Sequence, residues 1–254
     1  MKILCLHGAF NSASTFQMLL RPLMDAFEQL GSVEFVFLDG ARISPVPDAK
    51  SFAFFGPPPH FRWFGSDDPT SIDFEYRSSV MRDVPRGRTP EDKVRHVFGD
   101  AALARQAYEP ALARVLDFLR HQPDIDGVLG YSEGGSMAST VLFEEKRLFE
   151  QEGRPRQLKY GIFIGGTPGM AYAKNGTFKF LLADEVEHRL DVTTCHLVGC
   201  NDPFIHYSIA SYNICDKEKA FIFDHGGGHN IPRDKRTVTE LALSIKSVVE
   251  THVS

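Results

Sequence analysis

The sequence predicts an α/β fold in which a mostly parallel sheet of about six strands is flanked by helices. Short apolar segments typical of strands alternate along the chain with longer segments of helical periodicity. That alternation indicates right-handed β-α-β units, whose crossover helices pack back onto a parallel sheet. No internal repeat or linker-like stretch interrupts the 254 residues, so we expect residues 1–254 to form one domain.

The chain opens with a predicted strand at 2–7, a helix and a second strand at 33–38. The helix is expected because apolar residues recur at three- and four-residue steps between the two strands. Ser12 or Ser14 is available as its N-cap, and Gly31 ends it.

Residues 39–88 interrupt this pattern as an insertion after the second strand. Seven prolines exclude long helices from this stretch, and aromatic side chains crowd between Phe52 and Phe64. A loop this long is uncommon inside a compact domain, and it often serves as a lid or a binding loop. A surface insertion whose aromatic side chains pack onto the core is the alternative, and the sequence leaves both open.

Regular alternation resumes after residue 88. Thr89, Pro90 and the two acidic residues that follow predict the start of a helix, and a second helix follows Pro110. The remaining predicted elements are strands at 125–130, 159–165, 194–199 and 219–224, helices at about 134–149 and 204–212, and a closing helix that carries apolar residues from Val238 to Val249.

The segment Gly130-Tyr131-Ser132-Glu133-Gly134 matches the G-x-S-x-G pattern of a nucleophile elbow and joins a predicted strand to a predicted helix. A turn that sharp brings the two backbones together, so glycines at its ends avoid clashes. The turn lifts the serine hydroxyl out of the sheet, and the helix N-terminus favours the negative charge that develops in acyl transfer. We therefore predict that Ser132 is a nucleophile.

Two later residues complete a candidate triad in the chain order serine, acid, histidine, which is the order of α/β-hydrolases. Asp202 lies on a turn after the 194–199 strand and would orient an imidazole. Taken alone, it is better explained as an ordinary turn or N-cap aspartate, and only its combination with Ser132 and His229 favours the catalytic role. His229 lies in the glycine-rich loop before the closing helix. It is preferred as the base over His225, which adjoins the strand end.

The loop after the first strand carries Leu6-His7-Gly8-Ala9 and is predicted to supply one backbone N–H of an oxyanion hole. The residue after the nucleophile supplies the other. These donors are Ala9 and Glu133, with Phe10 as the alternate to Ala9. His7 is expected to hold the loop by hydrogen bonds, because a base must approach the serine from the other side.

Nearly the whole chain resembles the fungal FSH-type serine hydrolases, which are small cap-less α/β-hydrolases that include polyketide-releasing thioesterases and esterases. The resemblance rests on residues 3–8, the strand and elbow at 126–135, the Asp202-Pro203 turn, and the Gly-Gly-His229 loop with Pro232. Members of this family often carry Phe and Gln where this chain has Tyr131 and Glu133.

The resemblance implies a serine hydrolase that cleaves an acyl ester or thioester through an acyl-enzyme. A thioesterase that releases a polyketide or other acyl chain, including one bound to a carrier protein, fits the family. A carboxylesterase or lactonase acting on a small soluble ester fits the same chemistry. The resemblance also implies that the aromatic stretch with Trp63 and Phe64 contacts the substrate. This chemistry needs no cofactor.

Two other classes of function stay open. A ligand-binding receptor could use the same scaffold, since one fold hosts many functions, although an intact triad argues against it. A metal site could be built from Cys195, Cys200, His225 and His229, but their spacings match no common zinc pattern, and we predict no metal.

Charge and cysteine content narrow the expected partners and compartment. The formal net charge is -5, from 28 basic and 33 acidic residues mixed along the chain, so no nucleic-acid partner is expected. The apolar run at 3–6 is too short for a signal-peptide core or a membrane span. The four cysteines lack framework-like spacing and favour reduced thiols. These observations predict a cytoplasmic protein without a membrane partner.

Overall fold

The computed structural model describes residues 1–31, 33–44, 55–64, 88–98, 108–172, 178–186 and 189–253. Among these residues the main sheet has six strands, in the order β10-β9-β6-β5-β1-β2, and all neighbouring strands are parallel. Its strands are β1 (Lys2–Leu6), β2 (Glu34–Leu38), β5 (Gly127–Tyr131), β6 (Tyr160–Ile164), β9 (Thr193–Val198) and β10 (Ala220–Asp224). The predicted α/β fold with a parallel sheet of about six strands is confirmed.

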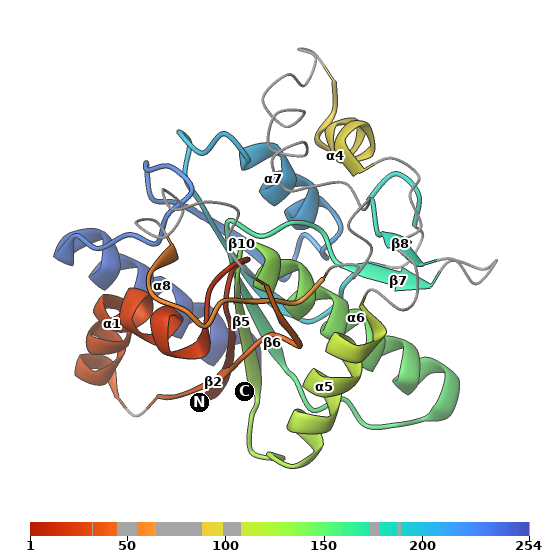
Figure 1. Cartoon of the computed structure of the whole chain (residues 1–254), viewed down its shortest axis with the longest axis horizontal. Helices are drawn as coiled ribbons and strands as arrows, with labels where there is room; N and C mark the ends of the chain where they lie inside the picture. Colours follow the sequence, from red (N-terminus) through yellow and green to blue (C-terminus); the bar gives the residue numbers. More distant parts are fainter. Residues whose placement is uncertain are drawn as a thin grey trace.

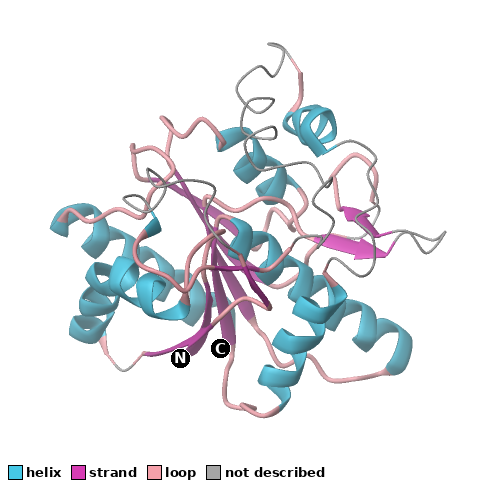
Figure 2. Cartoon of the chain, in the orientation of Figure 1, coloured by secondary structure: helices cyan, strands magenta, loops and turns pink. Residues whose placement is uncertain are grey.

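Helices cover both faces of this sheet (Figures 1 and 2). Along β1, Ile3 and Cys5 face one side, while Leu4 and Leu6 face the other, because successive side chains of a strand alternate. The first side is covered by α1 (Ala13–Leu30) and α8 (Lys235–Val253), and the second by α5 (Glu109–Arg120) and α6 (Glu133–Glu152). The α1 helix begins at the predicted N-cap Ser12, whose hydroxyl accepts from the Thr15 N–H.

Two further helices pack on each other at one end of the molecule, at the top of Figure 1: α4 (Pro90–Phe98) and α7 (Ile205–Asn213). The Thr89 hydroxyl accepts from the Asp92 N–H, as expected for the start of α4. Because α7 starts three residues after Asp202, this end of the molecule is also where the candidate acid lies.

Two small two-stranded antiparallel sheets were not predicted. One pairs β3 (Arg42–Ile43) with β4 (Phe61–Arg62), and the other pairs β7 (Met170–Tyr172) with β8 (Phe178–Phe180). Strands of two or three residues are too short to show an alternating pattern, so the sequence could not predict them. Residues 45–54 and 65–87 lie outside the described part of the chain, so the lid-like or surface character of 39–88 stays a prediction.

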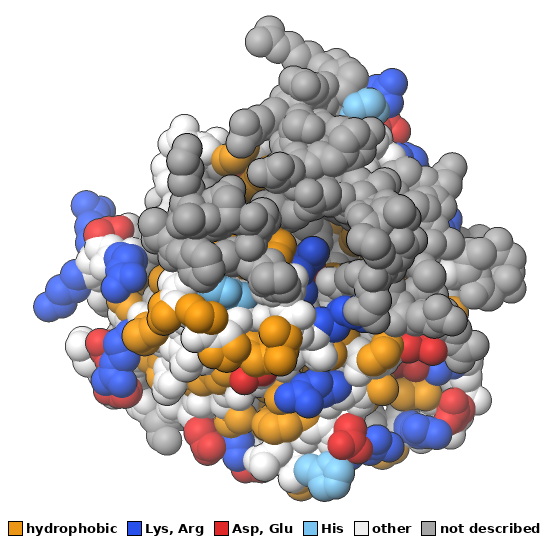
Figure 3. Space-filling model, viewed as in Figure 1, with side chains coloured by type: hydrophobic (Ala, Val, Ile, Leu, Met, Phe, Trp, Pro, Cys, Tyr) orange, Lys and Arg blue, Asp and Glu red, His pale blue; other side chains and the backbone are white. Residues whose placement is uncertain are grey.

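On the face drawn in Figure 3, acidic and basic side chains are interspersed among apolar ones. Within the described ranges, no helix combines the length and apolar character needed to cross a membrane.

The elbow glycines, Gly130 and Gly134, allow the sheet and α6 to pack backbone against backbone, because they carry no side chain. A Cβ at Gly134 would lie 2.1 Å from the Leu6 carbonyl oxygen, and one at Gly130 would lie 2.2 Å from the Gly134 carbonyl oxygen. Real Cβ atoms do not approach backbone this closely, so the β1, β5 and α6 backbones would have to separate.

We therefore expect Gly134→Ala to lower the free energy of unfolding by about 3 kcal/mol or more, which urea denaturation measures. Gly153→Ala is the matched control. Its Cβ would meet nothing within 4 Å, and only the φ of 68° is unfavourable, at a cost of about 1 kcal/mol. Equal losses in the two variants would contradict the close-contact explanation.

Candidate active site

Ser132 stands at the turn between β5 and α6 with φ 54° and ψ −117°. A positive φ is strained for a residue with a Cβ and costs about 1–3 kcal/mol, so the surrounding contacts must enforce it. The Ser132 N–H donates to the Ile164 carbonyl of the neighbouring β6 at 2.9 Å. This strained turn is the geometry predicted from the Gly-x-Ser-x-Gly pattern.

The structure brings Ser132, His229 and Asp202 into one hydrogen-bonded chain. The Ser132 Oγ lies 3.0 Å from the His229 Nε2, and the His229 Nδ1 lies 2.7 Å from the Asp202 Oδ2. They follow β5, β10 and β9 respectively, and the carboxyl ends of parallel strands meet at one edge of a sheet. Because a carboxylate only accepts, the neutral imidazole donates from Nδ1 and leaves Nε2 free to accept the serine proton.

Asp202 is held in place from its other oxygen. Its Oδ1 accepts from the Phe204 N–H at 2.7 Å, and the residue is only 4% exposed. The Phe204 ring meets the His229 ring edge-on at 5.1 Å. The aspartate therefore faces the histidine with one oxygen and its own turn with the other, which combines the two roles that the sequence offered for it.

Tyr131 anchors the histidine loop, a role that the sequence analysis missed. Its hydroxyl donates to the His229 carbonyl at 2.9 Å, and its ring stacks on the imidazole at a centroid distance of 5.5 Å. Burial raises the pKa of Tyr131 to about 12, so its hydroxyl remains protonated and able to donate. The available signal was a tyrosine directly before the candidate nucleophile.

Tyr131→Phe is expected to keep the ring contact and lose only the hydrogen bond to the His229 carbonyl. We expect kcat to fall by about threefold to tenfold and the free energy of unfolding to fall by about 1 kcal/mol. Steady-state kinetics and urea denaturation measure the two effects. Unchanged kcat with the stability loss intact would show that the bond serves the fold and does not position the imidazole.

The loop after β1 is fixed by His7, as predicted. His7 is fully buried; its Nε2 accepts from the Gly40 N–H at 2.8 Å, so its Nδ1 carries the proton and donates to the Gly8 carbonyl at 2.7 Å. At Gly8 a Cβ would lie 3.4 Å from the Ser132 Cβ, which places this loop against the nucleophile turn. Phe10 adopts a positive φ of 56°.

The predicted oxyanion donors lie on the two segments that meet at this contact. Ala9 and Phe10 follow Gly8 on the loop, and Glu133 is the first residue of α6. The first N–H groups of a helix have no partner within the helix, so the Glu133 N–H is available to a ligand as far as α6 is concerned. Ala9 and Phe10 both stay candidates for the second donor.

Burial lowers the pKa of His7 below its ordinary value of about 6.5, and burial lowers the pKa of His196 to about 3. Below about pH 6.5 the unfolded chain therefore binds protons on these histidines that the folded chain does not bind. The free energy of unfolding is highest above that pH and falls as the pH is lowered. Below it, we expect each histidine to reduce the free energy of unfolding by up to about 1.4 kcal/mol per pH unit. Urea denaturation between pH 7.5 and 5 tests this, and His7→Gln should give a shallower dependence than wild type; an identical slope would contradict it.

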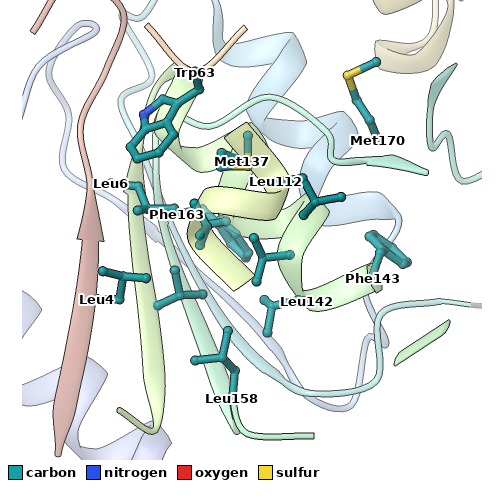
Figure 4. Close-up of a cluster of buried hydrophobic side chains, with 14 of the residues drawn as sticks. Leu4, Leu6, Trp63, Leu112, Met137, Leu142, Phe143, Leu158, Phe163 and Met170 are labelled. Carbon is teal, nitrogen blue, oxygen red and sulfur yellow. The ribbon is translucent and has the colours of Figure 1, made fainter. Parts of the chain in front are cut away.

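Trp63, a predicted substrate contact, lies in the core of the structure. Its side chain has no exposed surface, and its Nε1–H donates to the His7 carbonyl at 2.8 Å. Figure 4 shows it at one end of the core cluster next to Leu6. Burial of the indole against the loop leaves it no exposed face in this structure, and the contact of Trp63 with substrate stays a prediction. Phe64 is partly buried near Tyr108, and its contact with substrate stays a prediction.

Three of the four alternative metal ligands, His229, His225 and Cys195, are engaged elsewhere or buried. Both ring nitrogens of His229 already contact the triad, and the His225 Nδ1 accepts from the Gly227 N–H at 3.2 Å. The Cys195 thiol lies in the core, where burial raises its pKa to about 12. In the part of the chain that the structure describes, no three His, Cys, Asp or Glu side chains gather as metal ligands.

A parallel sheet covered on both faces, with a strained serine after a central strand and a histidine and aspartate from later loops, defines the α/β-hydrolase class. The chain belongs to the serine hydrolase (FSH1) family, whose sequence profile matches residues 1–241. Its members are serine hydrolases and esterases, and this chain is one of them.

Individual relatives agree with this assignment. The chain is 25% identical to Esterase FPY3 of Fusarium mangiferae over 255 residues, which covers 98% of this chain and 97% of the relative. It is also 25% identical to Esterase FUS5 of Gibberella moniliformis over 252 residues, which covers 98% and 88%. The crystal structure of esterase PE8 superposes with a TM-score of 0.52 at 19% identity, covering 97% and 92% of the two chains, and supports the fold alone.

Proposed function

We propose that this serine hydrolase cleaves an acyl ester or thioester through an acyl-enzyme formed on Ser132. The observation that carries the proposal is the continuous chain of contacts from the Ser132 Oγ through the His229 ring to the buried Asp202 carboxylate. In this assignment Ser132 is the nucleophile, His229 the base and Asp202 its orienting acid.

The reaction proceeds in two proton-balanced halves. His229 Nε2 takes the proton of Ser132 as the Oγ attacks the carbonyl carbon, and the backbone N–H groups of Glu133 and of Ala9 or Phe10 stabilise the oxyanion. The imidazolium returns the proton to the leaving alcohol or thiol as the acyl bond to that group breaks. Water then attacks the acyl-enzyme as His229 takes one of its protons. The bond between the acyl carbon and the Ser132 Oγ breaks, His229 returns the proton to that oxygen, and a free carboxylic acid leaves.

For the substrate, we propose an acyl chain delivered as a thioester, including a polyketide on a carrier protein, on the strength of the family resemblance. A carboxylesterase or lactonase that acts on a small soluble ester is the second candidate. It is favoured by the names of the two relatives described above, Esterase FPY3 and Esterase FUS5. Thioester and ester share the same acyl-enzyme, so the leaving group is what distinguishes them.

The test combines covalent labelling with substrate profiling. A fluorophosphonate is expected to add one adduct per chain, seen by intact mass and mapped to Ser132 by peptide analysis. Wild-type protein is then assayed with matched p-nitrophenyl esters and acyl thioesters of graded chain length. Higher kcat/KM for thioesters supports the first substrate class, and higher kcat/KM for esters supports the second. No adduct and no turnover would instead point to a ligand-binding receptor.

A further inference from the structure

A carboxylate lies beside the place where the proposed mechanism develops negative charge. Glu133 directly follows the nucleophile, and its backbone N–H is a proposed oxyanion donor. Its side chain is only 10% exposed, so solvent screens its charge weakly. An unpaired carboxylate here would oppose formation of the oxyanion, since like charges in a partly dry site repel strongly.

Arg62 pairs with this carboxylate in a forked geometry. Its Nε and Nη2 both donate to the Glu133 Oε1, at 3.2 Å and 2.8 Å, and the neighbouring Trp63 N–H donates to the Oε2 at 3.1 Å. Both carboxylate oxygens are therefore occupied, and the charge is balanced by a guanidinium whose side chain is itself 27% exposed.

The residues next to Arg62 also bind the loop after β1, which carries the other proposed oxyanion donor. The Phe61 N–H donates to the Asn11 carbonyl at 2.8 Å, and the Trp63 indole donates to the His7 carbonyl. The Arg62 guanidinium lies 5.0 Å from the centre of the Phe10 ring. Residues 61–63, which we call the oxyanion strap, thus contact both residue 133 and the loop that carries Ala9 and Phe10.

From these contacts we infer that Arg62 is a positioning residue for hydrolysis: it neutralises Glu133 and, within the oxyanion strap, fixes the two oxyanion donors relative to each other. The inference rests on the proposed acyl-enzyme mechanism.

The test compares Arg62→Ala, Glu133→Gln and the double variant. Arg62→Ala is expected to lower kcat by about tenfold, below the 10²- to 10³-fold typical of losing a direct oxyanion donor, with little change in KM. Adding Glu133→Gln is expected to restore most of that loss, because it removes the unpaired charge. Glu133→Gln alone should lose several-fold less than Arg62→Ala, since no unpaired carboxylate remains and its amide oxygen can still accept from Trp63.

A second readout isolates the transition state. A trifluoromethyl ketone forms a tetrahedral adduct with the active serine, so its inhibition constant should weaken in parallel with kcat in Arg62→Ala and recover in the double variant. Arg62→Lys keeps the positive charge and should retain more activity than Arg62→Ala. This lysine variant also tests the inference if the alanine variant folds poorly.

The results of these experiments distinguish a failure of the Arg62 inference from a failure of the proposed acyl-enzyme mechanism. Equal losses in the two single variants would mean an ordinary structural ion pair and would overturn the inference, as would a double variant no better than Arg62→Ala. Wild-type protein that neither turns over nor binds the ketone would instead remove the proposed function itself.

Discussion

Replacing Ser132 with alanine is expected to lower kcat for ester hydrolysis by about 10⁴- to 10⁶-fold and to abolish the fluorophosphonate adduct. Without the hydroxyl, no acyl-enzyme can form, and the oxyanion hole and substrate binding supply the only remaining acceleration. Initial rates with a p-nitrophenyl ester and intact mass after labelling measure both effects.

Ser136→Ala is the matched control for this variant. Ser136 lies one helical turn further along α6, is buried, and donates from its hydroxyl to the Pro168 carbonyl at 2.8 Å. Its loss should cost about 1 kcal/mol of stability and leave the adduct on Ser132. An adduct that persists in Ser132→Ala, or one that vanishes in Ser136→Ala, would mean that Ser132 is not the nucleophile.

Asp202→Asn is expected to lower kcat by about 10⁴-fold while the protein stays folded. The asparagine Oδ1 can still accept from the Phe204 N–H, but its amide then presents an N–H to the His229 Nδ1. The imidazole must accept there, so its proton moves to Nε2, and Nε2 can no longer take the proton of Ser132. Kinetics across pH 6–9, with circular dichroism to verify folding, measure the effect.

Asp224→Asn provides the comparison within the same pair of loops. The Asp224 Oδ1 accepts from the Cys200 and Gly226 N–H groups and is not hydrogen-bonded to the imidazole. An asparagine oxygen can replace it in both bonds, so kcat should stay within about threefold of wild type. If the two variants lost activity equally, Asp202 would be acting through loop structure and not through His229.

The sequence was informative wherever the signal is local. Strand and helix periods predicted the parallel sheet, and the five residues of the elbow predicted the strained turn at Ser132, because the glycine requirement arises from backbone contacts within one turn. The order of Ser132, Asp202 and His229 along a β-α-β chain was enough to select three residues that the structure brings into contact. The carboxyl ends of parallel strands lie at the same edge of the sheet, so residues that follow different strands in the sequence come close together in space.

The sequence alone could not predict contacts between segments that lie far apart in the chain, because no local pattern signals such contacts. The Arg62–Glu133 pair spans 71 residues, and the Tyr131–His229 bond spans 98. The family resemblance implied a substrate contact for Trp63, whereas the structure buries its indole in the core. Only the tertiary structure decided this, since the direction of its indole depends on the His7 carbonyl that receives its N–H and on the core space beside Leu6. Local pattern thus determined the elements and the order of the triad, while side-chain packing across the sheet edge decided which residues surround it.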